Sequence, residues 1–140
     1  MMSEPIVEQL VIELGNLQAR IQKKVGSALS VHGLGLSDYF VLNQLYVAPT
    51  QTMRRHDLAE LVGLSPSGIT RLLLPLEKIG LVEKETNPRD ARVSLVILSA
   101  AGKQLYEDAR LSFAEASSQL FKSLNAEQQN NLLAMLQALR

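Results

Sequence analysis

A short run of hydroxyl-bearing and basic residues near the middle of the chain has the chemistry to bind phosphates or the edges of nucleic-acid bases. Ser67, Thr70 and Arg71 are spaced so that a helix would place them on one face. A guanidinium group can make two hydrogen bonds to guanine, and a short hydroxyl can bond a phosphate or a base edge. The alternative is that these residues form the ordinary capped and solvated start of a helix.

A second candidate lies downstream in the segment Asn-Pro-Arg-Asp-Ala-Arg at 87–92. Asn-Pro favours a turn, and Arg89 and Arg92 flank the single carboxylate of Asp90. That carboxylate can hold Arg92 so that it points into a narrow, electronegative minor groove, whereas Arg89 suits a phosphate contact. The simpler interpretation is an ion pair between Arg92 and Asp90 with no further role.

The elements that must position these residues resemble a helix-turn-helix. Gly63 can take the positive φ that ends a short helix. Ser65 is a good N-cap for the next helix, and Pro66 suits its first position. Apolar spacing predicts the buried faces, at Leu58, Ala59 and Val62 in the first helix and at Ile69, Leu72, Leu73 and Leu76 in the second.

Two short apolar and β-branched runs, 81–86 and 93–98, predict a hairpin with the Asn-Pro-Arg-Asp-Ala-Arg segment at its tip. Ser99 is placed to cap another helix, with Gly102 in its first turn. The second helix of the helix-turn-helix carries Pro75 in its interior, so we expect a kink between Leu72 and Pro75.

Three stretches together resemble the MarR family of winged helix-turn-helix regulators: 58–71, 76–82, and 87–92 followed by Leu-Ser-Ala-Ala-Gly at 98–102. The resemblance covers nearly the whole chain. It implies a homodimer that binds a palindromic DNA operator, often as a repressor, and that releases DNA on binding a small anionic or phenolic effector. The expected DNA contacts are Ser65, Pro66, Ser67, Gly68, Thr70 and Arg71 in the recognition helix and Arg89, Asp90 and Arg92 in the wing, and the resemblance implies the minor-groove role of Arg92.

The flanking regions predict helices over about 6–29, 38–47, 100–121 and 126 to the C-terminus, with Ser37 and Asn125 as caps. The first and last are amphipathic and lie outside the winged helix-turn-helix. In the resembled family they interlock across a two-fold axis, although they could instead fold back on their own protomer. The expected dimer contacts are Leu10, Leu14, Leu17, Leu132, Leu136 and Leu139.

The predicted fold is therefore mainly α with a small β-hairpin wing, in a single domain spanning 1–140. Helices at about 6–32 and 103–140 would form the dimerisation region, and about 37–99 the DNA-binding lobe. The length suits one domain with a modest core.

Composition limits the function classes. The chain has no cysteine, which excludes disulfides, thiolate zinc sites and thiol redox switches. It shows neither a membrane span nor a secretory leader, so we expect a cytoplasmic protein. No metal set, phosphate loop or nucleophile–base pair is recognisable, so we expect no cofactor and no enzymatic activity. The net charge of zero, from 14 basic and 14 acidic residues, predicts modest, salt-sensitive DNA affinity.

Five further residues have more than one interpretation. His32 and Tyr39 flank the Gly33–Gly35 break, near where the resembled family binds effectors, yet His32 could be an ordinary surface histidine. Arg54 and Arg55 could contact phosphates or form a solvated charge pair. His56 is better explained as a helix-start residue than as a metal ligand.

The sequence thus predicts a dimeric, sequence-specific regulator that binds double-stranded DNA, with repression as the expected output. The alternative is a winged-helix protein-interaction module without specific DNA binding. The neutral charge and Pro75 favour that alternative, and the hydroxyl-bearing helix face favours the regulator.

Overall fold

The computed structural model describes residues 5–140, except for the side chains of Asn87 and Ala91. Residues 1–4 of the predicted domain lie outside this range. In the described part, helices and strands follow one another as α1 (Ile6–Ser30), α2 (Leu36–Val47), the 3-10 helix η1 (Pro49–Gln51), β1 (Thr52–Arg54), α3 (Arg55–Val62), α4 (Pro66–Lys78), β2 (Val82–Asn87), β3 (Asp90–Leu98), α5 (Ala100–Leu120) and α6 (Ala126–Gln137).

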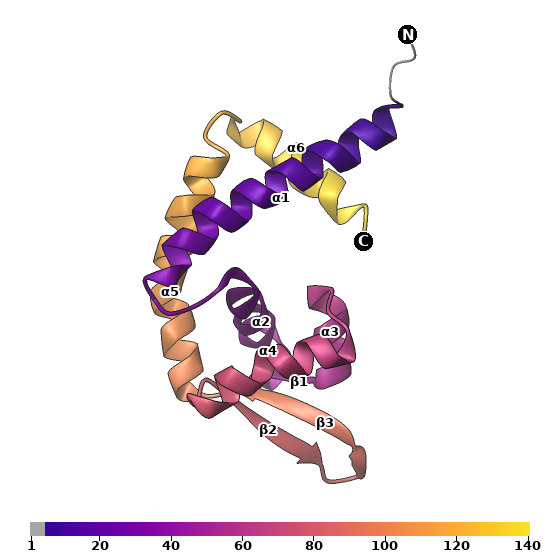
Figure 1. The fold of residues 1–140 in the computed structure, drawn as a ribbon, viewed down its shortest axis with the longest axis vertical. Helices are drawn as coiled ribbons and strands as arrows, with labels where there is room; N and C mark the ends of the chain where they lie inside the picture. Colours follow the sequence, from indigo (N-terminus) through magenta and orange to yellow (C-terminus); the bar gives the residue numbers. More distant parts are fainter. Residues whose placement is uncertain (1–4) are drawn as a thin grey trace.

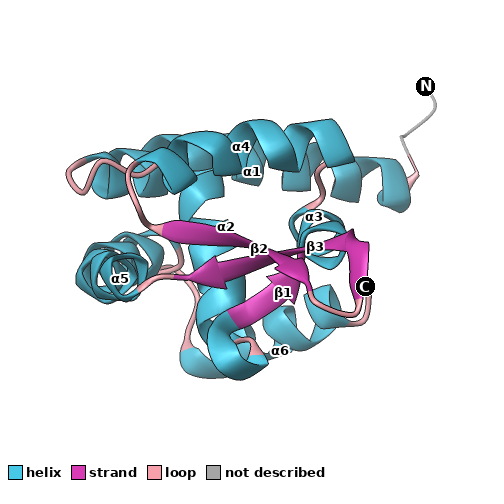
Figure 2. Ribbon diagram, turned by 90° about the horizontal axis from the view of Figure 1, so that it is seen from below, coloured by secondary structure: helices cyan, strands magenta, loops and turns pink. Residues whose placement is uncertain are grey.

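The helices divide between two ends of the molecule. Figure 1 shows most of α1 and all of α6 at one end, and α2, α3, α4 and the sheet at the other. Helix α5 runs between the two ends and packs against both α1 and α2. Figure 2 shows the three strands with helices around them, seen from below. The predicted fold, mainly helical with a small β wing, is confirmed.

The sheet is antiparallel with the order β1-β3-β2. Val82 pairs with Leu98 at the base of the predicted hairpin, and the register shifts by a bulge between Thr86 and Asn87. Strand β1 lies outside the segments for which the sequence predicts a helix or a strand. It pairs Thr52 with Ile97, so the third strand depends on an edge that β3 offers only after folding.

The hydrophobic core lies in the end of the molecule that contains the sheet, and it extends to the last two turns of α1. It is almost entirely aliphatic, as the low aromatic content predicts, and it joins five helices to the sheet. Its largest fully buried side chains are Val25, Leu29, Val41, Leu42, Leu45, Leu58, Ile69, Leu73, Val82 and Val96. The DNA-binding lobe predicted from sequence therefore shares one core with the end of α1.

Most predicted helix boundaries agree with the structure within a residue or two. The Ser37 cap is wrong, because α2 begins at Leu36 after Gly35. The Asp38 carboxylate instead accepts a hydrogen bond from the Gly35 backbone N–H at 2.8 Å. The Asn125 cap is confirmed, since its side chain accepts from Gln128 N at 2.9 Å.

Helix α4 continues through Pro75 to Lys78. Proline has no N–H, so the carbonyl of Arg71 loses its usual helical donor there, but the helix does not end. The predicted kink between Leu72 and Pro75 stays a prediction.

The start of α5 presses closely on the base of the hairpin. The Ser99 hydroxyl caps α5 by accepting from Gly102 N at 3.0 Å, as predicted, and lies 2.6 Å from the Gly80 carbonyl oxygen. A Cβ added to Gly102 would lie far inside 3.0 Å of the Leu81 carbonyl oxygen and 2.8 Å from a Leu98 methyl carbon. Only glycine fits where α5 leaves the wing.

None of the helices described has the combination of length and apolar character that crossing a membrane requires.

Candidate nucleic-acid interface

The turn between α3 and α4 has the geometry that the sequence predicts. Gly63 adopts φ 71°, and the N–H of Leu64 bonds back to the Ala59 carbonyl at 2.9 Å. The Ser65 hydroxyl then caps α4 by accepting from Gly68 N at 3.1 Å. The turn is closed by its own backbone and side-chain bonds, which fixes the direction in which α4 leaves it.

Helix α4 buries one face and exposes the other. Ile69, Leu73 and Leu76 are buried in the core, as predicted, while Leu72 is only half-buried. The expected DNA-contact residues Ser65, Pro66, Ser67, Thr70 and Arg71 are all exposed, and Gly68 is half-buried beneath the cap. The exposed face combines hydroxyl groups with one guanidinium and carries no carboxylate in the first two turns of the helix.

The hairpin of β2 and β3 projects from the same lobe as α4 (Figure 1). At its tip, Arg92 Nε lies 3.1 Å from Asp90 Oδ1 and Arg92 Nη2 lies 3.2 Å from Asp90 Oδ2. The Arg92 backbone N–H also donates to Asp90 Oδ1 at 3.0 Å. These hydrogen bonds from the Arg92 side chain and backbone lower the pKa of the Asp90 carboxyl.

The Arg92 side chain nevertheless remains 90% exposed. Asp90 therefore orients the guanidinium without covering it, which is the arrangement that insertion into a groove requires. Arg89 is also exposed at the tip.

Arg55 links three elements of the lobe through its guanidinium, so it is neither a solvated residue nor free for a phosphate contact as the sequence suggested. Its Nη2 lies 3.1 Å from Glu77 Oε1, in an ion pair whose side chains are only 17% and 24% exposed. The same guanidinium donates to Thr70 Oγ1 of α4 and to Ser94 Oγ of β3, each at 3.4 Å. It therefore ties the recognition helix to the wing, whereas its neighbour Arg54 is exposed.

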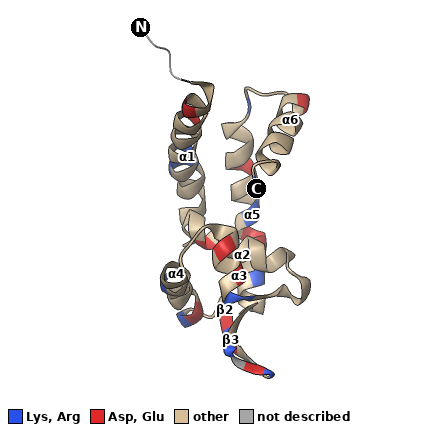
Figure 3. Cartoon of the chain, turned by 90° about the vertical axis from the view of Figure 1, so that its right-hand side faces the viewer, with Lys and Arg blue, Asp and Glu red and all other residues tan. Residues whose placement is uncertain are grey.

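The surface of this lobe has mixed charge. Figure 3 shows basic and acidic residues side by side along the hairpin, including its tip. Glu83 and Glu85 are exposed on β2, the strand that leads to the arginines of the tip. The positive charge is therefore confined to small areas rather than spread over a large field, as expected from the neutral composition.

His32 and Tyr39, the two candidate effector-binding residues, both contact side chains of α5. His32 Nε2 lies 2.8 Å from the hydroxyl oxygen of Ser112, and the Tyr39 ring stacks on Phe113 at a centroid distance of 4.3 Å. Tyr39 is only 2% exposed, and burial is the main cause that raises the pKa of its phenol. It lines a cavity of about 360 Å³ together with Arg110.

Among the residues that the structure describes, no three histidine or carboxylate side chains gather closely enough to hold an ion.

A capped recognition helix, a tight turn before it and a hairpin beside it define a winged helix-turn-helix protein. Comparisons with known proteins specify the family. A profile of the MarR family matches residues 34–94. The "Uncharacterized HTH-type transcriptional regulator YwhA" of Bacillus subtilis is 30% identical over 97 residues, which are 69% of this chain and 68% of that relative.

Solved structures agree over almost the full length. A MarR-family transcriptional regulator from Rhodococcus sp. RHA1 is 26% identical with a TM-score of 0.88, covering 98% of this chain and 96% of that one. Sco3205, a MarR-family regulator from Streptomyces coelicolor solved in complex with DNA, is 24% identical with a TM-score of 0.86, covering 99% and 89%. The chain belongs to the MarR family of transcriptional regulators.

Proposed function

We propose that this protein is a homodimeric, sequence-specific regulator that binds double-stranded DNA and represses transcription from a palindromic operator. One observation carries the proposal. The exposed face of α4, with Ser67, Thr70 and Arg71, lies in the same lobe as an Arg92 that Asp90 orients but does not cover. A helix face and an arginine so arranged suit a major groove and a neighbouring minor groove.

Each residue has a separate role in this proposal. Arg71 reads a base edge, because its guanidinium can bond guanine O6 and N7 together. Ser67 contacts phosphate or a base edge, and the Ser65 cap with Pro66 and Gly68 lets the helix start approach closely. In the wing, Arg92 enters the minor groove and Arg89 contacts phosphate. The complex of Sco3205 with DNA supports this class of partner.

The dimer is proposed from apolar surface that a single protomer leaves uncovered. Leu10, Leu14, Leu136 and Leu139 are 54%, 40%, 40% and 74% exposed, and Leu17 and Leu132 are half-buried. None of the described residues of α6 is buried. Exposed apolar surface of this extent on terminal helices needs a cover, and a second copy supplies one with matching surfaces.

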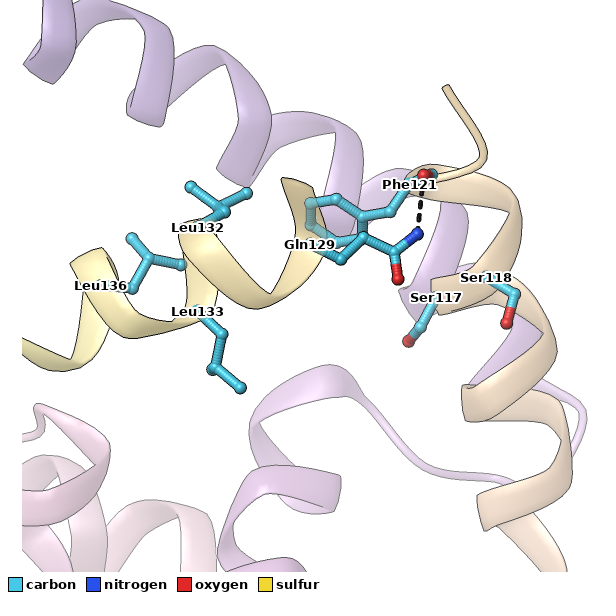
Figure 4. Close-up of a pocket in the computed structure, with 7 residues that line it drawn as sticks. All are labelled: Ser117, Ser118, Phe121, Gln129, Leu132, Leu133 and Leu136. Atoms are coloured by element: carbon cyan, nitrogen blue, oxygen red, sulfur yellow. Dashed lines mark hydrogen bonds between the residues drawn. The ribbon is translucent and has the colours of Figure 1, made fainter. Parts of the chain in front are cut away.

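Figure 4 shows part of this surface, a groove of about 460 Å³ where α6 leaves the end of α5. Leu132, Leu133 and Leu136 line it, and the side chain of Gln129 donates a hydrogen bond to the Phe121 carbonyl oxygen at 3.2 Å. We assign about 6–32 and 103–140 to dimerisation and about 37–99 to DNA binding. A two-fold dimer would then present two recognition helices roughly 34 Å apart, one turn of DNA.

An effector would change the distance between the DNA-binding lobes of the two protomers. The Tyr39 cavity is walled by α2 of the DNA-binding lobe and by α5, which leads to the dimer region. Arg110 in its wall suits an anionic or phenolic ligand. A ligand that favours another spacing would weaken binding, because both half-sites must be engaged together.

Sequence-specific DNA binding is tested by selecting bound sequences from a random duplex library and then titrating salt against the selected duplexes. We expect a palindromic consensus whose affinity falls steeply as salt rises. Arg92→Ala should weaken binding to that consensus by roughly tenfold or more without changing the circular dichroism spectrum. Lys122→Ala, which removes an exposed cation in the turn between α5 and α6, is the matched control.

The competing function is a protein-interaction module, which the mixed charge of the wing favours. Absence of any enriched sequence, with weak binding at low salt only, would support that module. The dimer is tested separately by sedimentation velocity. Leu136→Glu should give monomers, and Leu74→Glu, at a 50% exposed position on α4, should leave the dimer intact.

A further inference from the structure

A depression of about 410 Å³ lies between the recognition helix, the start of α3 and the wing. Its wall includes Arg54 at the end of β1, Arg55 and His56 at the start of α3, Thr70 of α4, and Arg92 and Ser94 of β3. Four nitrogen-bearing basic side chains thus converge on one hollow. Arg54 and His56 take no part in the base and groove contacts of the proposed function.

Most of the basic groups around the depression are already paired. Arg55 lies 3.1 Å from Glu77, and Arg92 lies 3.1 Å from Asp90. His56 Nε2 lies 3.3 Å from Glu60 Oε1, one helical turn away, with both side chains more than 70% exposed. Arg54 makes no ion pair within 4 Å among the described residues, and Asp57 lines a separate hollow on its other side.

In the described part of the chain, Arg54 and His56 are the two basic groups of this depression that are not held by a second element of the fold. Two arginines of the depression are paired with carboxylates, Arg55 with Glu77 and Arg92 with Asp90, whereas Arg54 has no such partner among the described residues. A proton on His56 adds one more positive charge beside Arg54. Histidine is the side chain whose charge ordinarily changes between about pH 5 and 8.

The position of the depression indicates its ligand. A recognition helix in a major groove and a wing in the adjacent minor groove must straddle one sugar-phosphate strand, because that strand separates the two grooves. The depression lies between α4 and β3, and so faces that strand. This step rests on the proposed function.

We propose that Arg54 and His56 form a binding subsite for a DNA backbone phosphate, and that His56 takes up a proton when the phosphate binds. A phosphate beside an imidazole favours the charged ring, which can then donate a hydrogen bond to it. Glu60 remains within reach of the same ring and stabilises its charge. Arg54 supplies a permanent positive charge beside it.

The proposal predicts that DNA binding strengthens as the pH falls. If the complex holds more protons than the separated molecules, the association constant rises on acidification. One proton per protomer gives at most about tenfold per pH unit, and two protomers on a palindrome at most about a hundredfold. We expect at least about fivefold between pH 7.5 and pH 6.0, since uptake is partial across that interval.

The test measures the affinity for a selected duplex by fluorescence anisotropy at constant ionic strength, from about pH 8 to pH 6. Wild type should gain affinity on acidification. His56→Asn should lose that gain, and His56→Arg should bind tightly at every pH. The matched control is His32→Asn, because the chain has two histidines and His32 bonds Ser112 far from the wing.

Salt titration at both pH limits tells a phosphate contact from a conformational effect. The slope of log K against log salt should be steeper at pH 6 by about 0.9 for each half-site in wild type, and unchanged in His56→Asn. His56 is an exposed side chain, so its variants should melt at the wild-type temperature.

Two results would overturn the proposal. If His56→Asn keeps the wild-type pH dependence and salt slope, the proton is not on His56. If His32→Asn alone abolishes the pH dependence, the titrating group is at α5 instead. Failure of wild type to bind any duplex at any pH is distinguishable from both, because it would refute the proposed function itself.

Discussion

Replacing Gly102 by alanine tests the contact that joins the wing to α5. The added Cβ would lie far inside 3.0 Å of the Leu81 carbonyl oxygen, and 2.8 Å from a methyl carbon of Leu98. A leucine methyl can rotate away, but the carbonyl belongs to the backbone that follows α4 and starts β2. Relief therefore requires α5 to move away from the base of the hairpin.

The expected magnitude follows from two opposing effects. Alanine in place of glycine inside a helix contributes up to about 1 kcal/mol of stability. Overpacking against a rigid backbone costs about 1–3 kcal/mol or more. We therefore expect a net loss of about 1–2 kcal/mol in the free energy of unfolding, which lowers Tm by roughly 3–8 °C in a domain of this size.

Thermal melts followed by circular dichroism measure this change, at equal protomer concentrations because dimerisation contributes to Tm. Gly26→Ala is the matched control. Gly26 lies inside α1, and a Cβ there meets nothing within 4 Å, so this variant should be at least as stable as wild type. A Gly102→Ala variant that melts at or above the wild-type temperature would refute the close approach of α5 to the hairpin.

Three more predictions concern the same lobe. A double-mutant cycle with Arg55→Gln and Glu77→Gln should give a coupling of about 1 kcal/mol in urea unfolding, since the pair is mostly shielded from solvent; additive effects would contradict the ion pair. In a carbon NMR titration, the pKa of the Asp90 carboxyl should lie below its ordinary value of 3.8 in the wild type and should rise in Arg92→Ala. The Asp90–Arg92 ion pair is therefore present above this lowered pKa and is lost as the pH falls through it. Ser99→Ala should cost about 1 kcal/mol by removing the α5 cap, and an unchanged denaturant midpoint would argue against it.

Local chemistry made much of the recognition element predictable. Gly63, Ser65 and Pro66 act through bonds to their own near neighbours, so their residue types alone indicate where one helix ends and the next begins. The pairing of Arg92 with Asp90 spans two residues and was also expected. The mistaken cap at Ser37 has the same origin. Two neighbouring residues can each serve as the N-cap of a helix. Gly35 takes that position here because the Asp38 carboxylate accepts a hydrogen bond from its backbone N–H.

Long-range contacts were not predictable in this way. The sequence spacing says nothing about Arg55 reaching Glu77 and Ser94, because 22 and 39 residues separate the partners. The hydroxyl of Tyr106 donates to Asn43 at 2.6 Å across 63 residues, another bond without a local signal. The convergence of Arg54, His56 and Arg92 on one hollow belongs to the same group.

By itself, the sequence determined the family, the order of the helices, the turn before the recognition helix and the pairing of Arg92 with Asp90. Each of these depends on spacing within a few residues, where backbone geometry limits the choices. Only the tertiary structure decided that Arg55 pairs with Glu77, that β1 completes the sheet, and that Gly102 must remain without a side chain. These outcomes depend on which distant surfaces meet, and packing of the whole core settles that.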